Sequence, residues 1–465
     1  MLKNSNKDSS RSIRIAVIAL SITAAVLIAL FIIGYALLTD TAVMQDKDYI
    51  LGHLEQSIID NTESGSASIL SFLDDAGIAG YNRRMLRTAE SYFHIYYPFD
   101  LPSAAELARE TATLFIEYCY DNIDLGNKTA VTDALIRCYV EATGDTWAVY
   151  RTEEEYEIYD EDMSGNIVGI GVTVYYADKD TVCPTVESVI PDSPAHEAGI
   201  MAGDIIIAVD GVSCEQIGRT SLASAIRGEE GTQVQITLLR DGAELTVSVT
   251  RRLINETTVY WEIHGDGIAY IRITKFKATT DEQFKEAIDA IESAGAIGVI
   301  FDLRSNPGGY LDSVVNALSY LVPYGTNIVS FRYASEKHDT VYTADDYHTL
   351  NIPCAVICNK NTASAGELFT AGIRDYCDMG LLEGVTVGAK TYGKGVMQST
   401  FEIGSGSTLT LTVALYNPPS GVNYEGLGVA PDFDVKYAQG DTDPQLDKAM
   451  EELYKLIATE PGVAA

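Results

Sequence analysis

The pattern of hydrophobic and polar positions changes several times along the chain, and each change predicts a different kind of structure. A first segment, Ile15–Leu38, has 24 residues without a charge, which as an α-helix would measure about 36 Å and cross a bilayer. After it come apolar residues at helical spacing, then short β-rich runs with glycine and aspartate turns, then alternating strand and helix patterns. We therefore divide the chain into a cytoplasmic tail (1–14), a transmembrane anchor (15–38), a helical N-terminal region (39–160), a β-rich domain (161–252), an α/β core (253–440), and a C-terminal helix and tail (441–465).

The charges around the first apolar segment predict its orientation. The residues ahead of it carry four cations and one acid, namely Lys3, Lys7, Arg11, Arg14 and Asp8. The positive-inside rule then keeps the N-terminus in the cytoplasm. A cleavable signal peptide is the alternative, but it usually has a shorter apolar region and ends in an A-x-A-like site, whereas Leu38 is followed by Thr-Asp-Thr-Ala-Val. We favour an uncleaved single-pass anchor in the cell membrane, with everything from about Thr39 onward outside.

The β-rich region contains a recognisable motif, VESVIPDSPAHEAGIMAGDIIIAVDGV, at Val186–Val212. It predicts a strand, a short helix at Pro194–Gly199, the strand Ile205–Val209 and a hairpin turn. This order resembles a PDZ domain. The resemblance implies that Gly169, Ile170, Gly171 and Val172 form the loop whose backbone amides bind a peptide's C-terminal carboxylate, while the peptide adds a strand to the sheet edge. The alternative is that these glycines only make a tight start to a strand.

The fourth region alternates strands and helices. Ile268–Ile273 and the continuous apolar run Ile297–Leu303 predict strands, the second of them a buried parallel one. A helix is predicted from near Thr280, a second one carries apolar residues from Leu311 to Leu318, and a strand follows near Ile328–Phe331. Such repetition predicts a mostly parallel sheet covered by helices, with functional groups at the carboxyl ends of its strands.

A serine stands at one such strand end. The apolar strand Ile352–Cys358 runs into the polar turn Asn359–Thr362, and a helix is predicted from about Ala365. Ser364 therefore lies where free backbone N–H groups and the positive end of a helix dipole would stabilise a developing oxyanion. Taken alone, a serine at the start of a helix is more often an ordinary N-cap than a nucleophile.

Four ordered blocks settle the interpretation of this serine. They read DLRSNPGG, TASAGE, TYGKGVMQ and PPSGVNYEGLGVAPD, and lie within Phe301–Asp432. Together they resemble the active-site blocks of the carboxyl-terminal processing (tail-specific) peptidases of the S41 family, and the resemblance covers about Thr111–Val435. It implies a multidomain α+β protein in which a PDZ domain precedes an α/β crotonase/ClpP-like catalytic core, and it implies a serine-type peptidase.

Single residues acquire implied roles from their places in these blocks. The resemblance implies that Ser364 is the nucleophile, that Lys394 is its general base, and that Gln398 orients the lysine. The implied oxyanion hole uses the backbone amides of Gly308 and Ala365.

A further acidic residue, Asp375, matches a position that supports the site in some relatives, although with Arg374 it would also serve as a helix-end cap. The interval from Ser364 to Lys394 is 30 residues, several more than is usual in the family. We expect the extra residues in Cys377–Thr386.

A lysine base has to be neutral to accept a proton. A free lysine has a pKa of about 10.4 and is protonated at neutral pH, but burial favours the neutral amine. We therefore expect the surroundings of Lys394 to be apolar and free of carboxylates. Lys390 is the rival candidate, and an exposed solubilising lysine is its more ordinary interpretation.

Composition excludes several other classes of function. The formal net charge of -34 argues against nucleic-acid binding, which needs a basic face. None of the six histidines stands in a catalytic motif, and G-x-S-x-G, H-E-x-x-H and paired C-x-x-C motifs are absent from the sequence. We expect no metal or organic cofactor. Seven cysteines do not form a disulfide framework, and pairing of Cys183 with Cys214 is left open.

The expected function is a membrane-anchored serine endopeptidase with a Ser-Lys dyad, which cleaves exported proteins recruited by the PDZ domain. The expected partners are protein or peptide substrates with free, apolar C-termini, the membrane, and a second copy in a homodimer through the helical region. The alternative is a catalytically silent PDZ scaffold that only binds C-termini.

Overall fold

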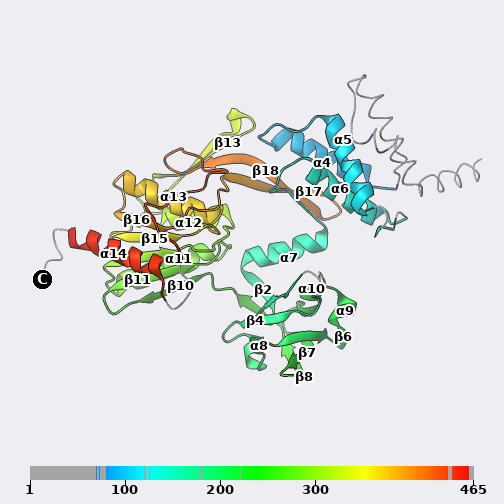
Figure 1. Cartoon of the computed structure of the whole chain (residues 1–465), viewed down its shortest axis with the longest axis horizontal. Helices are drawn as coiled ribbons and strands as arrows, with labels where there is room; N and C mark the ends of the chain where they lie inside the picture. Colours follow the sequence, from blue (N-terminus) through cyan, green and yellow to red (C-terminus); the bar gives the residue numbers. More distant parts are fainter. Residues whose placement is uncertain are drawn as a thin grey trace, which may run out of the picture. The chain divides into compact units, whose positions relative to one another are not determined.

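The computed structural model describes residues 70, 73, 80–119, 122–124, 126–178, 181–219, 221–437 and 442–459. The predicted membrane anchor, Ile15–Leu38, lies outside these residues. Within the described ranges, no helix combines the length and apolar character needed to cross a membrane. The chain divides into two compact units, Met1–Tyr150 with Thr400–Leu411 and Arg151–Ser399 with Thr412–Ala465 (Figure 1).

The first unit is mainly helical, as its apolar spacing predicts. Its described helical segments are α4 (Arg83–Tyr96), α5 (Ala104–Leu114), a π-helical turn (Phe115–Cys119) and α6 (Lys128–Ala142). Side-chain caps explain where they begin: Asn82 accepts the amide of Met85 before α4, and Ser103 forms a reciprocal capping box with Glu106 before α5. The short strand β1 (Val149–Arg151) was not predicted from the sequence.

The second unit begins with α7 (Glu153–Ser164) and contains the β-rich domain. The strands and helices of this domain are β2 (Asn166–Gly169), β3 (Val172–Tyr175), β4 (Thr185–Val189), α8 (Pro194–Glu197), β5 (Ile205–Val209), β6 (Val212–Ser213), α9 (Cys214–Ile217), α10 (Leu222–Ile226), β7 (Gln233–Arg240), β8 (Ala243–Thr250) and β9 (Arg252–Asn255). Its sheet has the order β3-β4-β5-β7-β8, so β3 is an edge strand. The predicted hairpin turn is present, since Asp210 and Gly211 both have positive φ.

The core of the second unit is a six-stranded sheet of order β10-β11-β12-β15-β16-β19. Its strands are β10 (Val259–Ile263), β11 (Ile268–Ile273), β12 (Gly298–Asp302), β15 (Cys354–Cys358), β16 (Gly384–Gly388) and β19 (Phe433–Asp434). All neighbours from β11 to β19 pair in parallel, and only the edge strand β10 is antiparallel. Every residue of β12 and β15 is buried, which confirms the interpretation of the continuous apolar run as a covered parallel strand.

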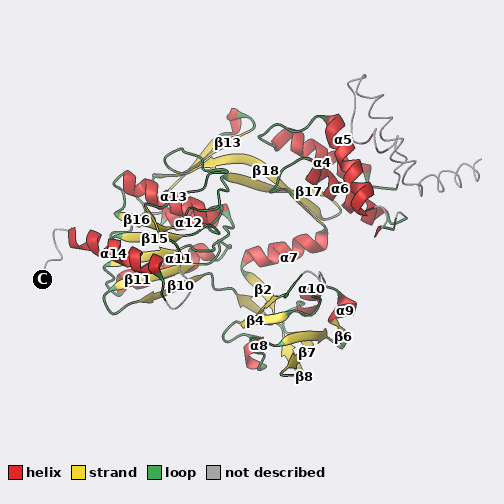
Figure 2. Ribbon diagram, in the orientation of Figure 1, coloured by secondary structure: helices red, strands yellow, loops and turns green. Residues whose placement is uncertain are grey.

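Helices cover both faces of this sheet (Figure 2). They are α11 (Thr280–Ser293), α12 (Leu311–Ser319), α13 (Ala365–Asp378) and α14 (Pro444–Thr459). α14 packs on one face, where Leu453 and Ala449 contact Ile300 and Ile357 of the sheet. On α13, Phe369 forms a T-shaped ring pair with Phe301 of β12 at 5.4 Å between centroids. This apolar packing fixes the two ends of the segment that carries Ser364.

A second, antiparallel sheet corrects the expectation of one mostly parallel arrangement. The predicted strand near Ile328 is β13 (Asn327–Tyr333), which pairs antiparallel with β14 (Thr340–Thr343) and with β18 (Ser407–Asn417) instead of joining the parallel sheet. β17 (Val396–Gly404) also pairs with β18. The hairpin of β13 and β14 needs no helical crossover, and antiparallel pairing follows from so short a connection.

Candidate active site

Ser364 lies at the turn between β15 and α13, as predicted. Its backbone has φ 53° and ψ -119°, which a non-glycine residue rarely adopts. Such a conformation persists only where surrounding structure holds it, and it concentrates at functional turns. Ser364 is also the N-cap of α13 and forms a capping box with Glu367, but an ordinary N-cap residue has extended backbone with negative φ. Its backbone therefore departs from that of an ordinary cap.

Glu367 joins the serine turn to the lysine turn. Its carboxylate is fully buried and accepts the backbone amide of Ser364 at 2.9 Å and that of Lys394 at 2.7 Å. It also accepts the amide of Gly393 at 2.6 Å and the hydroxyl of Thr391 at 2.5 Å. Four donors around one carboxylate are enough to offset the cost of burying its charge. The turns that carry the two predicted catalytic residues are therefore neighbours in the fold.

Two carboxylates nevertheless lie at the backbone of the lysine turn, whose neighbours in sequence are uncharged. Glu367 bonds the amide of Lys394 itself, and Glu425 accepts the amide of the next residue, Gly395, at 2.6 Å. The reason is geometric, since a tight glycine-bracketed turn exposes several amides in a buried place and carboxylates satisfy them.

A loop from Pro418 to Val429 holds the other side of the lysine turn. Asn423 donates to the carbonyl of Gly395 at 2.8 Å, and the amide of Gly426 donates to the carbonyl of Gly393 at 2.9 Å. A Cβ on Gly393 would lie 2.9 Å from the amide nitrogen of Gly428. The two glycines that bracket Lys394 are thus required by this close backbone approach.

Tyr416 was missed by the sequence reasoning. It lies near the end of β18, is buried, and donates its hydroxyl to the carbonyl of Lys394 at 2.8 Å. Burial raises the pKa of Tyr416, so its hydroxyl stays protonated at neutral pH. A tyrosine at the end of an alternating strand carries no signal beyond its nearness to the PPSG block.

The N-P-G-G turn lies directly against the serine turn. A Cβ on Gly308 would lie 2.7 Å from Cβ of Ser364 and 2.9 Å from the amide nitrogen of Ala365. The Gly308 amide, a predicted oxyanion donor, donates to Oδ1 of Asn306 at 2.8 Å. Among the residues that the structure describes, the amides of Ala365 and Gly309 have no such partner. Use of the Gly308 amide in an oxyanion hole therefore requires exchange of the Asn306 bond.

The two remaining predicted site residues make bonds of their own. Gln398 lies on β17 and donates to the carbonyl of Val396 at 3.2 Å, so its part in orienting the lysine stays a prediction. Asp375 is buried and accepts the amide of Ser420 at 2.9 Å, with Arg374 at 3.5 Å from its other oxygen. Asp375 therefore anchors the loop that in turn holds the lysine turn.

The predicted carboxylate-binding loop divides between core and surface. Ile170 belongs to the hydrophobic core of the β-rich domain, and its carbonyl accepts the amide of Ala195 at 2.7 Å. Gly171 has φ 84°, and a Cβ there would lie 2.7 Å from Oγ of Ser193, so only glycine fits. Gly169 ends β2 and Val172 begins the edge strand β3.

The thiols and possible metal ligands add no second chemistry. Cys183 and Cys214, whose pairing the sequence left open, are free thiols, and that of Cys214 donates to the carbonyl of Ile206 at 3.2 Å. Within the described ranges, no group of three or more His, Cys, Asp or Glu side chains is placed to hold a metal ion.

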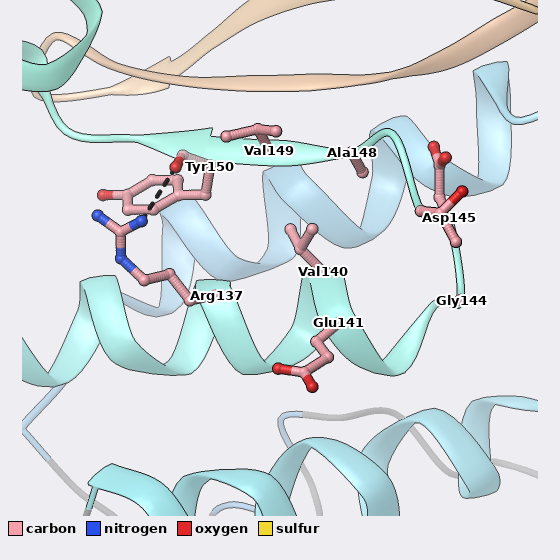
Figure 3. A pocket seen from close by; sticks show the side chains of 9 residues that line it. Arg137, Val140, Glu141, Gly144, Asp145, Ala148, Val149 and Tyr150 are labelled. Carbon is pink, nitrogen blue, oxygen red and sulfur yellow. Dashed lines mark hydrogen bonds between the residues drawn. The ribbon is translucent and has the colours of Figure 1, made fainter. Parts of the chain in front are cut away.

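A separate hollow of about 430 Å³ lies in the N-terminal unit, between α6 and β1 (Figure 3). The guanidinium of Arg137 lies over the ring of Tyr150 and donates to its carbonyl at 3.2 Å. None of the residues that line the hollow is a serine, cysteine or lysine. It holds none of the predicted catalytic residues and is not the candidate site.

Comparisons with known proteins show the family of this chain. The sequence matches peptidase family S41 over residues 267–435 and the PDZ domain family over residues 185–240. It is 31% identical over 342 residues to the carboxy-terminal processing protease CtpA of Bacillus subtilis (strain 168), covering 70% of this chain and 72% of that protein. A "Probable CtpA-like serine protease" of Staphylococcus haemolyticus (strain JCSC1435) is 30% identical over 331 residues, covering 70% and 65%. The solved structure of a photosystem II D1 C-terminal processing protease aligns with a TM-score of 0.46 and 23% identity, covering 81% and 97%. The chain belongs to peptidase family S41, as a serine-type carboxy-terminal processing peptidase with a PDZ domain.

Proposed function

We propose that this protein is a membrane-anchored endopeptidase that works outside the cytoplasm and uses Ser364 and Lys394 as a catalytic dyad. The observation that carries the proposal is the buried Glu367 carboxylate, which accepts the amides of both residues at 2.9 and 2.7 Å. Two turns that are tied together through one group keep a fixed spacing, as a nucleophile and its base require.

The proposed reaction proceeds through an acyl-enzyme. Ser364 Oγ attacks the scissile carbonyl and gives its proton to the neutral Lys394 Nζ, which passes it to the leaving amine. The amides of Ala365 and Gly308 hold the oxyanion, once Gly308 has exchanged its bond to Asn306. Water, deprotonated by the lysine, then releases the new C-terminus and regenerates the serine.

The proposed route of substrates to this site begins at the PDZ domain. Support comes from β3, which has a sheet neighbour on one side only. An extended peptide can add to such an edge through main-chain hydrogen bonds, with its terminal carboxylate at Gly169–Val172. Free apolar C-termini suit this mode, because partly buried apolar side chains such as Val172 and Val174 flank the edge.

Full-length protein in lipid vesicles tests the dyad. The substrate is an unfolded protein with an apolar C-terminus, offered with a free or an amidated terminal carboxylate. Ser364→Ala and Lys394→Ala should each abolish cleavage, whereas Lys390→Ala, at an exposed position four residues away, should not. Cleavage that survives Ser364→Ala or Lys394→Ala would contradict the dyad. A parent protein that binds tails without cleaving them would instead favour the silent scaffold.

A further inference from the structure

Lys277 is a buried lysine that the proposed reaction does not use. Its side chain is fully buried, and its ammonium group lies 3.0 Å from Asp162 and 2.5 Å from Glu256. Both acids are partly exposed, at 40% and 30% of their side-chain surface. Taking an ammonium group out of water is costly, and an ion pair of this kind seldom improves stability over an apolar residue. Lys277 is therefore a candidate for a role beyond stability.

The two acids stand where the chain enters and where it leaves the PDZ domain. Asp162 lies in the last turn of α7, before β2, and Glu256 comes directly after β9. β2 and β9 pair with each other as a two-stranded ribbon, which forms the stem of the PDZ domain. The amide of Glu256 also donates to the carbonyl of Gly165 at 2.9 Å. Lys277 therefore binds both strands of the stem at its base.

On its other side, Lys277 follows Phe276, whose backbone is hydrogen-bonded to the N-P-G-G turn. Phe276 donates its amide to the carbonyl of Gly308 at 3.0 Å, and accepts the amide of Tyr310 at 2.7 Å. Phe276 thus pairs with the turn on both sides of Gly309. This N-P-G-G turn lies directly against Ser364.

We propose that Lys277 is a positioning residue that holds the N-P-G-G turn, through Phe276, in a place set by the stem of the PDZ domain. The ammonium group fixes the stem on one side, and the Phe276 backbone fixes the turn on the other. A shift of the stem is therefore passed through Lys277 and Phe276 to the amides of Gly308 and Gly309. Even a small shift matters, because an oxyanion donor has to lie about 2.7–3.1 Å from the oxyanion. The catalytic part of this inference rests on the proposed role of Ser364, whereas the structural part does not.

The partly exposed acids provide variants that keep the fold intact. Lys277→Met leaves two acids without their cation and is expected to lower stability, so Asp162→Asn and Glu256→Gln are the principal variants. Each removes one charge and leaves Lys277 paired with the other acid. Asp346→Asn is the matched control, since Asp346 forms an ion pair with Lys285 of α11 at 3.4 Å, away from the stem.

Hydrogen exchange in full-length protein tests the structural part without relying on activity. The Tyr310 amide, bonded to Phe276, should exchange about tenfold faster in Asp162→Asn and Glu256→Gln than in the parent, while Asp346→Asn leaves it unchanged. If exchange across residues 304–311 is the same in all four proteins, the inference is overturned, whatever the activity.

Kinetics test the catalytic part. In the same two variants kcat should fall about tenfold with KM unchanged for an amidated peptide, and a peptide boronate, which mimics the tetrahedral intermediate, should bind weaker by the same factor. Unchanged kcat and boronate affinity beside a lowered melting temperature would reduce Lys277 to a stabilising role and overturn the proposal. If the parent neither cleaves nor binds the boronate, the proposed function fails, and hydrogen exchange still decides the structural part.

Discussion

The carboxylate of Glu367 accepts the backbone amide of Lys394 at 2.7 Å, although 27 residues separate them in sequence. The bond matters because Oε2 of the same carboxylate accepts the amide of Ser364. The spacing of the turns that carry the proposed nucleophile and the proposed base is therefore set by a residue outside the proposed dyad. A glutamate in the S-A-x-E block acts here as the common support of two catalytic turns.

Glu367→Gln should disable the enzyme more than it unfolds it. Both oxygens of the Glu367 carboxylate accept hydrogen bonds, and glutamine replaces one of them with an NH2 group that cannot accept. At least one buried N–H or O–H donor then loses its acceptor, which costs about 1–3 kcal/mol of stability. A displacement of about 1 Å between the two turns would lower kcat about 100-fold. The measurements are kcat for the amidated peptide and the free energy of unfolding in urea. Glu282→Gln, at an exposed position in the first turn of α11, is the control, and equal activity of the two variants would contradict the role of Glu367.

Tyr416→Phe removes one hydroxyl and keeps the ring. The carbonyl of Lys394 loses a hydrogen bond, so we expect kcat to fall about tenfold, the worth of one such bond. Ring packing against Tyr424, at 5.8 Å between centroids, should keep the change in melting temperature small. Steady-state kinetics and calorimetry check both. The same change at the exposed Tyr260 should have no effect, and full activity of Tyr416→Phe would exclude Tyr416 from the site.

Gly308→Ala places a methyl group 2.7 Å from Cβ of Ser364 at a residue with φ 97°. Backbone strain alone costs about 1–2 kcal/mol, and the contact with the serine turn displaces the nucleophile as well. We expect loss of cleavage beyond detection and a moderate fall in melting temperature. Gly295→Ala separates the two causes, because Gly295 has φ 76° and open space around it. It should lose stability only, and an active Gly308→Ala variant would exclude the Gly308 amide from the oxyanion hole.

Asp375→Asn tests an indirect support of the lysine turn, which runs through the loop Pro418–Val429. Asp375 holds the amide of Ser420, and Ser420 lies in the loop whose Asn423 bonds the carbonyl of Gly395. A neutral amide weakens a charge-assisted bond by roughly half, so kcat should fall several-fold with KM unchanged. Asp378→Asn, at the exposed end of the same helix, is the control. A rise in KM alone, with kcat unchanged, would point to substrate contact instead.

The pattern of apolar and polar residues predicted the strand and the helix that flank Ser364, because each of these elements depends on a few consecutive residues. The apolar run of β15 and the polar turn after it place the serine, and glycines around Lys394 mark a tight turn. Glu367 and Tyr416 could not be found in this way, since their bonds to Lys394 span 27 and 22 residues. The antiparallel partner of β13 was missed for the same reason, since β18 is distant in sequence and periodicity does not report which strands pair.

His348 gives the core a pH-dependent contribution to stability. Burial alone would lower its pKa, but hydrogen bonds to the carbonyl of Tyr320 and to Glu292 outweigh burial, so its pKa is raised above the ordinary 6.5. A raised pKa in the folded state means that the contribution is complete below pH 6.5 and is lost as pH rises through the raised value. Its ring is 4.0 Å from that of Tyr320.

His348→Gln should therefore lower the melting temperature more at pH 5.5 than at pH 9. We expect the pH-dependent part to be at most about 1 kcal/mol, since Glu292 is partly exposed, which corresponds to a difference of about 2–4 °C. Scanning calorimetry at the two pH values measures it. His338→Gln, on the exposed turn Glu336–His338, should change the melting temperature equally at both. A His348→Gln effect that grows towards pH 9 would show that the neutral ring, stacked on Tyr320, supplies the stabilisation and that the ion pair with Glu292 contributes nothing.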